Sequence, residues 1–153
     1  MALQSPVTRD NILTSLIPYF NDPRYYLLVL DMGFGKLDDL RDKYPNRVIN
    51  CGIMEQGTVG IASGMAESGL IPIVYSIASF LVYRGLEQIK NDIVDRNLNV
   101  KLIGNGSGDF FKKMGKCHWC KDDDIKLMEV IGMPVYTNFE EWINSSEAGY
   151  IRV

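Results

Sequence analysis

An unbroken apolar run, Tyr25–Leu30, constrains the fold of this chain more than any other feature. A continuous run marks a strand that is buried on both faces, whereas a strand with one wet face alternates apolar and polar residues. A second buried strand is expected at Ile71–Ser76, and helical patterns alternate with strand patterns along the chain. Such alternation predicts a parallel sheet with helices packed on its faces.

The patterns predict a three-layer α/β fold, with a mostly parallel six-stranded sheet and helices on both faces. We expect residues 1–153 to form a single domain, because the chain has 153 residues and shows no linker or repeat. The expected strands cover residues 25–30, 47–50, 71–76, 100–104, 133–136 and 149–153. The expected helices cover an apolar stripe at residues 12–17 and then residues 36–43, 55–67, 80–94, 122–130 and 139–145.

Charge and hydropathy exclude several classes of protein. The formal net charge of −3 argues against a nucleic-acid partner, because nucleic-acid modules usually present a basic face. No apolar run reaches the roughly 20 residues that a membrane-spanning helix needs. Residues 1–10 lack the basic-then-apolar pattern of a signal peptide. Since the three cysteines also suit a reducing compartment, we expect a cytoplasmic protein.

Three loops follow expected strands and contain residues with functional potential: Asp31–Gly33, Cys51–Glu55 and residues 105–121. Ligands of open parallel sheets bind at the carboxyl ends of the strands, where these loops lie. Gly33 and Gly35 form a G-x-G, but no dinucleotide fingerprint or phosphate loop accompanies them. A flavodoxin-like nucleotide-binding domain is therefore only an outside alternative.

Glu55 stands where an expected strand gives way to a helix rich in small residues. A glutamate in a first helical turn is ordinarily just a favourable partner of the helix dipole. The helix also contains Gly57, Gly60 and Gly64, and an interior glycine costs about 1 kcal/mol relative to alanine. We expect these glycines to allow close packing against the sheet, a second helix or a cofactor.

The order and spacing of several segments resemble the transketolase family. Residues 47–56 resemble its strand leading into G-I-x-E-Q, and residues 60–72 resemble its small-residue helix ending in G-x-x-P. Ser79-Phe80-Leu81 is similar to its T-F-L segment, residues 88–100 continue in register, and residues 118–125 resemble its T-H-x…E-D-I segment. The resemblance runs from about residue 25 to the C-terminus, and it is to the pyrimidine-binding domain shared with deoxyxylulose-phosphate synthase.

This resemblance implies a thiamine-diphosphate site. The carboxyl of Glu55 would hydrogen-bond N1′ of the cofactor's aminopyrimidine and so activate the cofactor, which supplies the difficult chemistry. Phe80 would pack on the pyrimidine ring, and Tyr83, one helical turn on, can face the same ligand. Ile53 and Asp31, in the loops after two strands, are further candidate cofactor-binding residues. The alternative for both aromatic residues is plain core packing.

His118, the only histidine, matches a family histidine that faces the substrate and can transfer a proton. A lone histidine is otherwise most often a structural or surface residue. The sequence Cys117-His-Trp-Cys-Lys121 departs from the usual T-H-Q run, so substrate preference is expected to differ from ordinary transketolase. The C-x-x-C has neither a thioredoxin-like setting nor four zinc ligands, and we expect free thiols and no metal site in this chain.

The family's motif for holding the diphosphate, G-D-G followed later by N, does not occur in the sequence. We therefore expect a separate subunit whose partner has the diphosphate-binding domain and holds Mg²⁺ or Ca²⁺. An α2β2 heterotetramer is the simplest assembly. The expected reaction transfers a two-carbon ketol unit from a ketose to an aldehyde, with sugar or sugar-phosphate substrates. A decarboxylating condensation, an acyl transfer or a non-catalytic regulatory subunit are the alternatives.

Overall fold

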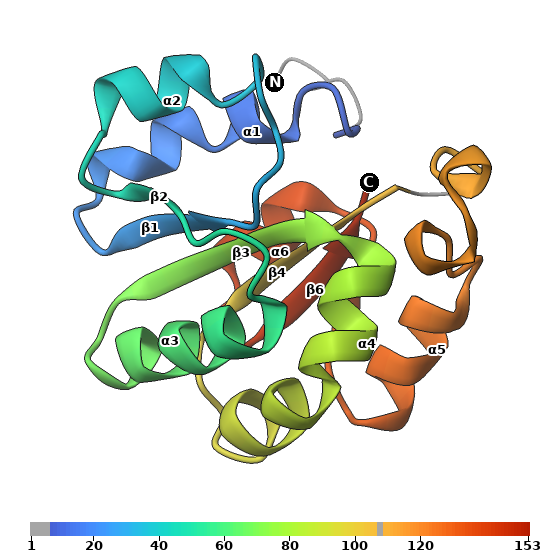
Figure 1. The fold of residues 1–153 in the computed structure, drawn as a ribbon. Coiled ribbons are helices and arrows are strands. Elements are labelled where there is room, and N and C mark those ends of the chain that lie inside the picture. Colours follow the sequence, from blue (N-terminus) through green and yellow to red (C-terminus); the bar gives the residue numbers. More distant parts are fainter. Residues whose placement is uncertain (1–6, 107–108) are drawn as a thin grey trace.

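A six-stranded parallel sheet forms the centre of the computed structural model, which describes residues 7–106 and 109–153 (Figure 1). Its strand order is β2-β1-β3-β4-β6-β5, and each pairing between neighbours is parallel. The strands are β1 (Tyr25–Val29), β2 (Val48–Asn50), β3 (Ile71–Ile77), β4 (Lys101–Asn105), β5 (Val135–Tyr136) and β6 (Gly149–Arg152). The predicted fold class is confirmed.

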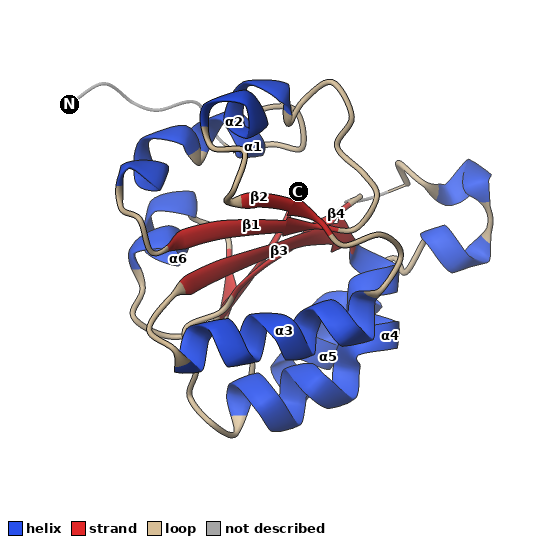
Figure 2. Ribbon diagram, turned by 60° about the vertical axis from the view of Figure 1, so that its left-hand side comes forward, coloured by secondary structure: helices blue, strands red, loops and turns tan. Residues whose placement is uncertain are grey.

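Helices cover both faces of the sheet, as Figure 2 shows. One face packs against α1 (Ile12–Ser15), the 3₁₀ helix η1 (Ile17–Asn21), α2 (Asp38–Lys43) and α6 (Phe139–Asn144). The other face packs against α3 (Glu55–Glu67), α4 (Ala78–Gln88), the π-helical η2 (Ile89–Val94) and α5 (Asp123–Val130).

The burial of β1 on both faces of the sheet explains why its sequence is apolar throughout. Successive side chains of a strand point to opposite faces of the sheet. Leu27 and Val29 lie in the core beneath α1 and α2, whereas Leu28 and Leu30 lie in the core beneath α3 and α4. Because both faces are covered, every position of this strand must be apolar.

Several element boundaries differ from the prediction. The first expected helix divides into α1 and η1 around Pro18, which lacks a backbone N–H and stands in the first turn of η1. The expected helix at residues 80–94 begins at Ala78, and its last turn is π-helical. The loop expected at 105–121 contains the 3₁₀ turns η3 (Lys112–Met114) and η4 (Lys116–His118). Residues 107 and 108 of that loop, and residues 1–6 of the N-terminal segment, lie outside the described residues.

A buried polar contact fastens α5, and with it the end of the loop before it, to the sheet. The Tyr150 hydroxyl of β6 donates a hydrogen bond to the fully buried carboxylate of Asp124. Arg152 pairs with the same carboxylate at 2.9 Å. Burial and the adjacent Asp124 carboxylate both raise the pKa of Tyr150, so its hydroxyl stays protonated and continues to donate.

Candidate active site

The parallel sheet brings the candidate residues to one edge. Because all strands run the same way, the loops after β1, β2 and β4 and the first turns of α3 and α4 share the carboxyl edge of the sheet. Glu55 is the first residue of α3, and Phe80 is the third residue of α4. The two helices pack against each other.

Glu55 is buried there, with only 3% of its side chain exposed. Its Oε1 accepts a hydrogen bond of 2.9 Å from Nη1 of Arg84, which neutralises the buried carboxylate. The Arg84 guanidinium also lies over the Phe80 ring, with Cζ 3.8 Å from the ring centre. This stacking is a cation–π contact, so one planar cation joins the acid to the aromatic ring.

Gly85 permits the close approach of α3 and α4 beside this group. A Cβ at Gly85 would lie 3.2 Å from Cγ2 of Val59 and 3.9 Å from the backbone oxygen of Glu55. The tight contact is with Val59, whereas 3.9 Å is an ordinary van der Waals distance from the Glu55 backbone. The absence of a side chain at Gly85 therefore lets α3 and α4 lie close together beside Glu55.

His118 reaches the same group from the loop between β4 and α5. Its ring centre lies 4.7 Å from that of Phe80. The Sγ of Cys117 lies 3.1 Å from Nδ1 of His118, and the Ser79 hydroxyl donates a hydrogen bond of 2.8 Å to the carbonyl oxygen of Cys117. A chain of contacts thus runs from Glu55 through Arg84 and Phe80 to His118.

The other three predicted cofactor residues make their contacts elsewhere. Asp31, exposed and in the left-handed region with φ 50°, donates its backbone N–H to Oδ1 of Asn50 at 3.1 Å. Ile53 is 69% exposed. The Tyr83 hydroxyl lies 3.4 Å from Oδ2 of Asp123, and burial together with that carboxylate raises the pKa of Tyr83. The cofactor roles of these three residues stay predictions.

Sequence reasoning missed Arg84. It follows Phe80 by four residues, and residues four apart in a helix lie on the same face. A buried glutamate also requires a nearby cation or a hydrogen-bond donor. Those two arguments together could have singled out Arg84, whereas Ser79 had no comparable signal in the sequence.

The three cysteines are free thiols. Cys120 is buried, and burial together with the Asp124 carboxylate raises its pKa to about 11. Cys117 is exposed and directly precedes His118 in η4. Within residues 7–106 and 109–153, no group of three or more His, Cys, Asp or Glu side chains could hold a metal ion, and no helix is long and apolar enough to cross a membrane.

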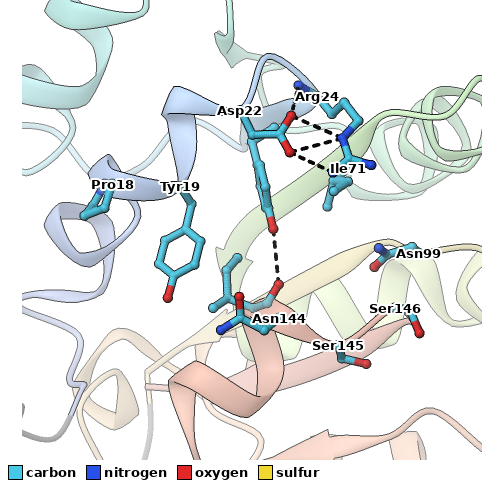
Figure 3. A pocket seen from close by; sticks show the side chains of 11 residues that line it. Pro18, Tyr19, Asp22, Arg24, Ile71, Asn99, Asn144, Ser145 and Ser146 are labelled. Atoms are coloured by element: carbon cyan, nitrogen blue, oxygen red, sulfur yellow. Dashed lines mark hydrogen bonds and ion pairs between the residues drawn. The ribbon is translucent and has the colours of Figure 1, made fainter.

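A cavity of about 500 Å³ lies at the opposite edge of the sheet, where β1 and β3 begin (Figure 3). Some of its polar groups pair with each other or with the backbone: Arg24 pairs with Asp22 at 2.7 Å, and the Tyr25 hydroxyl donates to the carbonyl oxygen of Ile143 at 3.3 Å. The side-chain oxygen of Asn99, in contrast, is buried without a hydrogen-bond partner among the described residues. None of the predicted site residues lines this cavity. The candidate catalytic residues therefore lie at the carboxyl edge, away from this cavity.

The fold and its carboxyl edge define a class of proteins. Residues 21–118 match the family described as "Transketolase, pyrimidine binding domain", and the chain belongs to that family. This confirms the resemblance found in the sequence.

The chain is also similar to individual proteins. Over 116 residues the chain is 34% identical to an uncharacterized 33.6 kDa protein in the fasciation locus of Rhodococcoides fascians, covering 76% of this chain and 36% of that protein. Over 90 residues it is 40% identical to a subunit of the apulose-4-phosphate transketolase of Actinobacillus succinogenes, covering 59% of this chain and 29% of the relative.

Among solved structures, the chain is similar to a split-gene transketolase described as an inactive β4 tetramer. The TM-score is 0.76 at 28% sequence identity, over 94% of this chain and 49% of that one. The chain thus spans between 29% and 49% of the length of these three proteins. It is a transketolase-type sequence, related to subunits of enzymes that use thiamine diphosphate.

Proposed function

We propose that this chain is a subunit of a heteromeric, thiamine-diphosphate-dependent enzyme that transfers a two-carbon ketol unit from a ketose to an aldehyde. The observation that supports the proposal best is the contact between Glu55, Arg84 and Phe80. A buried carboxylate at a helix start, beside an aromatic ring, is the arrangement that an aminopyrimidine needs. The name of the relative from Actinobacillus succinogenes favours a sugar-phosphate ketose as substrate.

The residues present fit the aminopyrimidine half of thiamine diphosphate. The space beside Glu55 and above Phe80 already accepts a planar group with N–H donors, since the Arg84 guanidinium makes both contacts. When bound, thiamine diphosphate supplies the chemistry that makes and breaks the carbon–carbon bond. In this proposal Glu55 holds a proton bridge to the ring nitrogen, and Phe80 forms one wall of the ring's site.

His118 is proposed to serve the substrate. Its ring adjoins Phe80, and its Nδ1 is next to the Cys117 thiol, which leaves Nε2 as the nitrogen for a substrate oxygen. An imidazole at that place can donate a hydrogen bond or move a proton as the carbon–carbon bond forms or breaks.

A second subunit is proposed to hold the diphosphate and its Mg²⁺ or Ca²⁺, in an α2β2 assembly. The sequence has no Gly-Asp-Gly, and the relative from Actinobacillus succinogenes is named as one subunit of a transketolase. The edge that contains Glu55 also presents large exposed apolar side chains after β1, β2 and β4, which are Phe34, Ile53, Met54, Phe110 and Met114. Exposed apolar groups gathered around a candidate site favour a partner surface.

The outward face of α3 supports the same proposal. Gly57, Gly60, Ile61 and Gly64 share one face of the helix, and a Cβ at Gly60 or Gly64 would meet nothing within 4 Å. We expected these glycines to allow close packing, but among the described residues no atom lies close enough to require a glycine at Gly60 or Gly64. Glycine destabilises a helix interior relative to alanine. We propose that glycines occupy this face because another chain approaches it closely.

The test is Glu55→Gln in the complex reconstituted with the partner subunit. We expect turnover to fall about a hundredfold or more, with the fold retained, because the amide cannot share a proton in the same way. Glu67→Gln at the exposed end of the same helix is the matched control. Near-normal turnover in Glu55→Gln would refute the role. Parallel assays with a ketose phosphate and with pyruvate separate ketol transfer from a decarboxylating condensation.

A further inference from the structure

Arg84 makes the two contacts that the proposed function assigns to the cofactor ring. Its Nη1 donates to the Glu55 carboxylate at 2.9 Å, and its planar guanidinium covers the Phe80 ring at 3.8 Å. A guanidinium and an aminopyrimidine share the relevant chemistry, because both are flat and both present N–H donors at their edge. One carboxylate and one ring face cannot serve both groups in the same place.

We propose that Arg84 is a gatekeeping residue of the cofactor site, which occupies the place of the aminopyrimidine until thiamine diphosphate displaces it. The inference rests on the proposed function, since it takes Glu55 and Phe80 as the cofactor's contacts. It adds Arg84 to the site and states that Arg84 competes with the cofactor for Glu55 and Phe80. Cofactor binding is then an exchange of one planar partner of Glu55 for another.

The surroundings of Arg84 allow this exchange. Its side chain is 43% exposed, whereas that of Glu55 is 3% exposed, so the guanidinium can swing outward while the acid stays in place. The pair also has a stabilising role before the cofactor arrives, because a buried carboxylate without a partner is strongly unfavourable. Arg84 therefore stabilises the cofactor-free chain and competes with the cofactor, and these two effects have opposite signs.

Because Arg84 should raise stability but lower cofactor affinity, the experiment measures both quantities in one variant. Thiamine diphosphate, with Mg²⁺, is titrated calorimetrically into the complex of the full chain and its partner subunit, for the wild type and for Arg84→Met. The melting temperature of each chain is measured without cofactor. We expect Arg84→Met to melt lower yet to bind thiamine diphosphate about fivefold more tightly, which corresponds to about 1 kcal/mol.

Arg96→Met is the matched control. Arg96 pairs with Glu67 of α3, so this variant also removes an exposed arginine from a glutamate of the same helix. We expect its cofactor affinity to equal that of the wild type. If Arg84→Met does not fold, Arg84→Lys serves instead, because lysine keeps the charge but loses the planar group. We expect Arg84→Lys to bind about twofold more tightly than the wild type, which is less than half the gain of Arg84→Met on a free-energy scale.

Salt provides a second readout. Raising the ionic strength weakens a partly exposed ion pair. The roughly fivefold advantage of Arg84→Met over the wild type should therefore fall towards one as the salt concentration rises. Salt also weakens binding of the diphosphate, but it does so in both proteins, so this effect cancels in the ratio of their affinities. If the wild type binds but the variants bind equally or more weakly, the gatekeeping role is refuted and the proposed function stands. If no complex binds thiamine diphosphate, both are refuted.

Discussion

The Ser79 hydroxyl donates a hydrogen bond of 2.8 Å to the carbonyl oxygen of Cys117, and this bond ties the start of α4 to the loop that contains His118. Ser79 immediately precedes Phe80, and Cys117 immediately precedes His118. One buried hydroxyl therefore sets the distance between the proposed ring wall and the proposed proton-transfer group. The contact joins residues 38 positions apart in the sequence.

Ser79→Ala should reduce turnover several-fold with only a small loss of stability. A single hydrogen bond contributes about 1 kcal/mol to stability, but its loss frees the His118 loop from α4. Steady-state kinetics of the reconstituted complex and thermal melting of the chain check this expectation. Ser68→Ala is the control, because that hydroxyl bonds only the carbonyl oxygen of Gly64 in its own helix. Equal kinetics in the two variants would contradict the positioning role.

The sequence predicted the sheet well because burial leaves a direct signal in composition. Tyr25–Leu30 had to be apolar at every position once both faces were covered, and the neighbouring strand could be recognised in the same way. The pairing of Glu55 with Arg84 left a weaker signal, because it depends on how two helices approach at Gly85. The bond between Ser79 and Cys117 could not be predicted, since nothing local in the sequence specifies where a long loop returns.

Gly104→Ala should destabilise the chain by about 3 kcal/mol, at the upper end of the overpacking range. A Cβ at Gly104 would lie 2.0 Å from the hydroxyl oxygen of Tyr150. That ring cannot move aside easily, because it is fully buried and its hydroxyl is bonded to Asp124. Denaturant unfolding of the isolated chain provides the measurement. A loss below about 1 kcal/mol, the lower end of that range, would mean that the ring relocates at little cost.

Gly60→Ala should have the opposite effect on the isolated chain. The position is helical and a Cβ there meets nothing within 4 Å, so alanine should stabilise the chain by up to about 1 kcal/mol. In the complex, the same methyl should weaken assembly if the outward face of α3 meets the partner. Unfolding of the isolated chain and titration of the partner separate the two effects. Unimpaired assembly would remove this face from the proposed interface.

Alkylation should distinguish the two cysteines of the His118 loop. Since the pKa of Cys120 is about 11, only about one thiol in a thousand is ionised at pH 8, and the side chain is also buried. Iodoacetamide should therefore modify exposed Cys117 long before Cys120, as peptide mass spectrometry would show. The group added beside His118 should inhibit turnover in step with Cys117 modification. Cys117→Ser should make the complex resistant, and inhibition that persists in that variant would place the sensitive thiol elsewhere.

Lys101 should make stability depend on pH in an unusual direction. The side chain is fully buried in β4, and Nζ donates to the carbonyl oxygens of Ser145 at 2.9 Å and Glu147 at 2.6 Å. Burial lowers the pKa of Lys101 from 10.5 to about 8, although the Glu147 carboxylate partly opposes the shift. Between about pH 8 and 10.5 the unfolded chain therefore holds a proton that the folded chain has released. The Lys101 contribution to the free energy of unfolding should rise with pH in this window, by up to about 1.4 kcal/mol per pH unit.

Other groups titrate in the same range, so the contribution of Lys101 must be isolated by difference. The pKa of Cys120 is raised to about 11 and that of Tyr75 to about 12, and both shifts make the folded state less stable as the pH rises. Subtracting the free energy of unfolding of Lys101→Met from that of the wild type at each pH cancels these effects. The variant is expected to be less stable throughout, because methionine leaves two carbonyl oxygens without their donor. A difference curve that stays flat from about pH 8 to 10 would show that buried Lys101 keeps its proton.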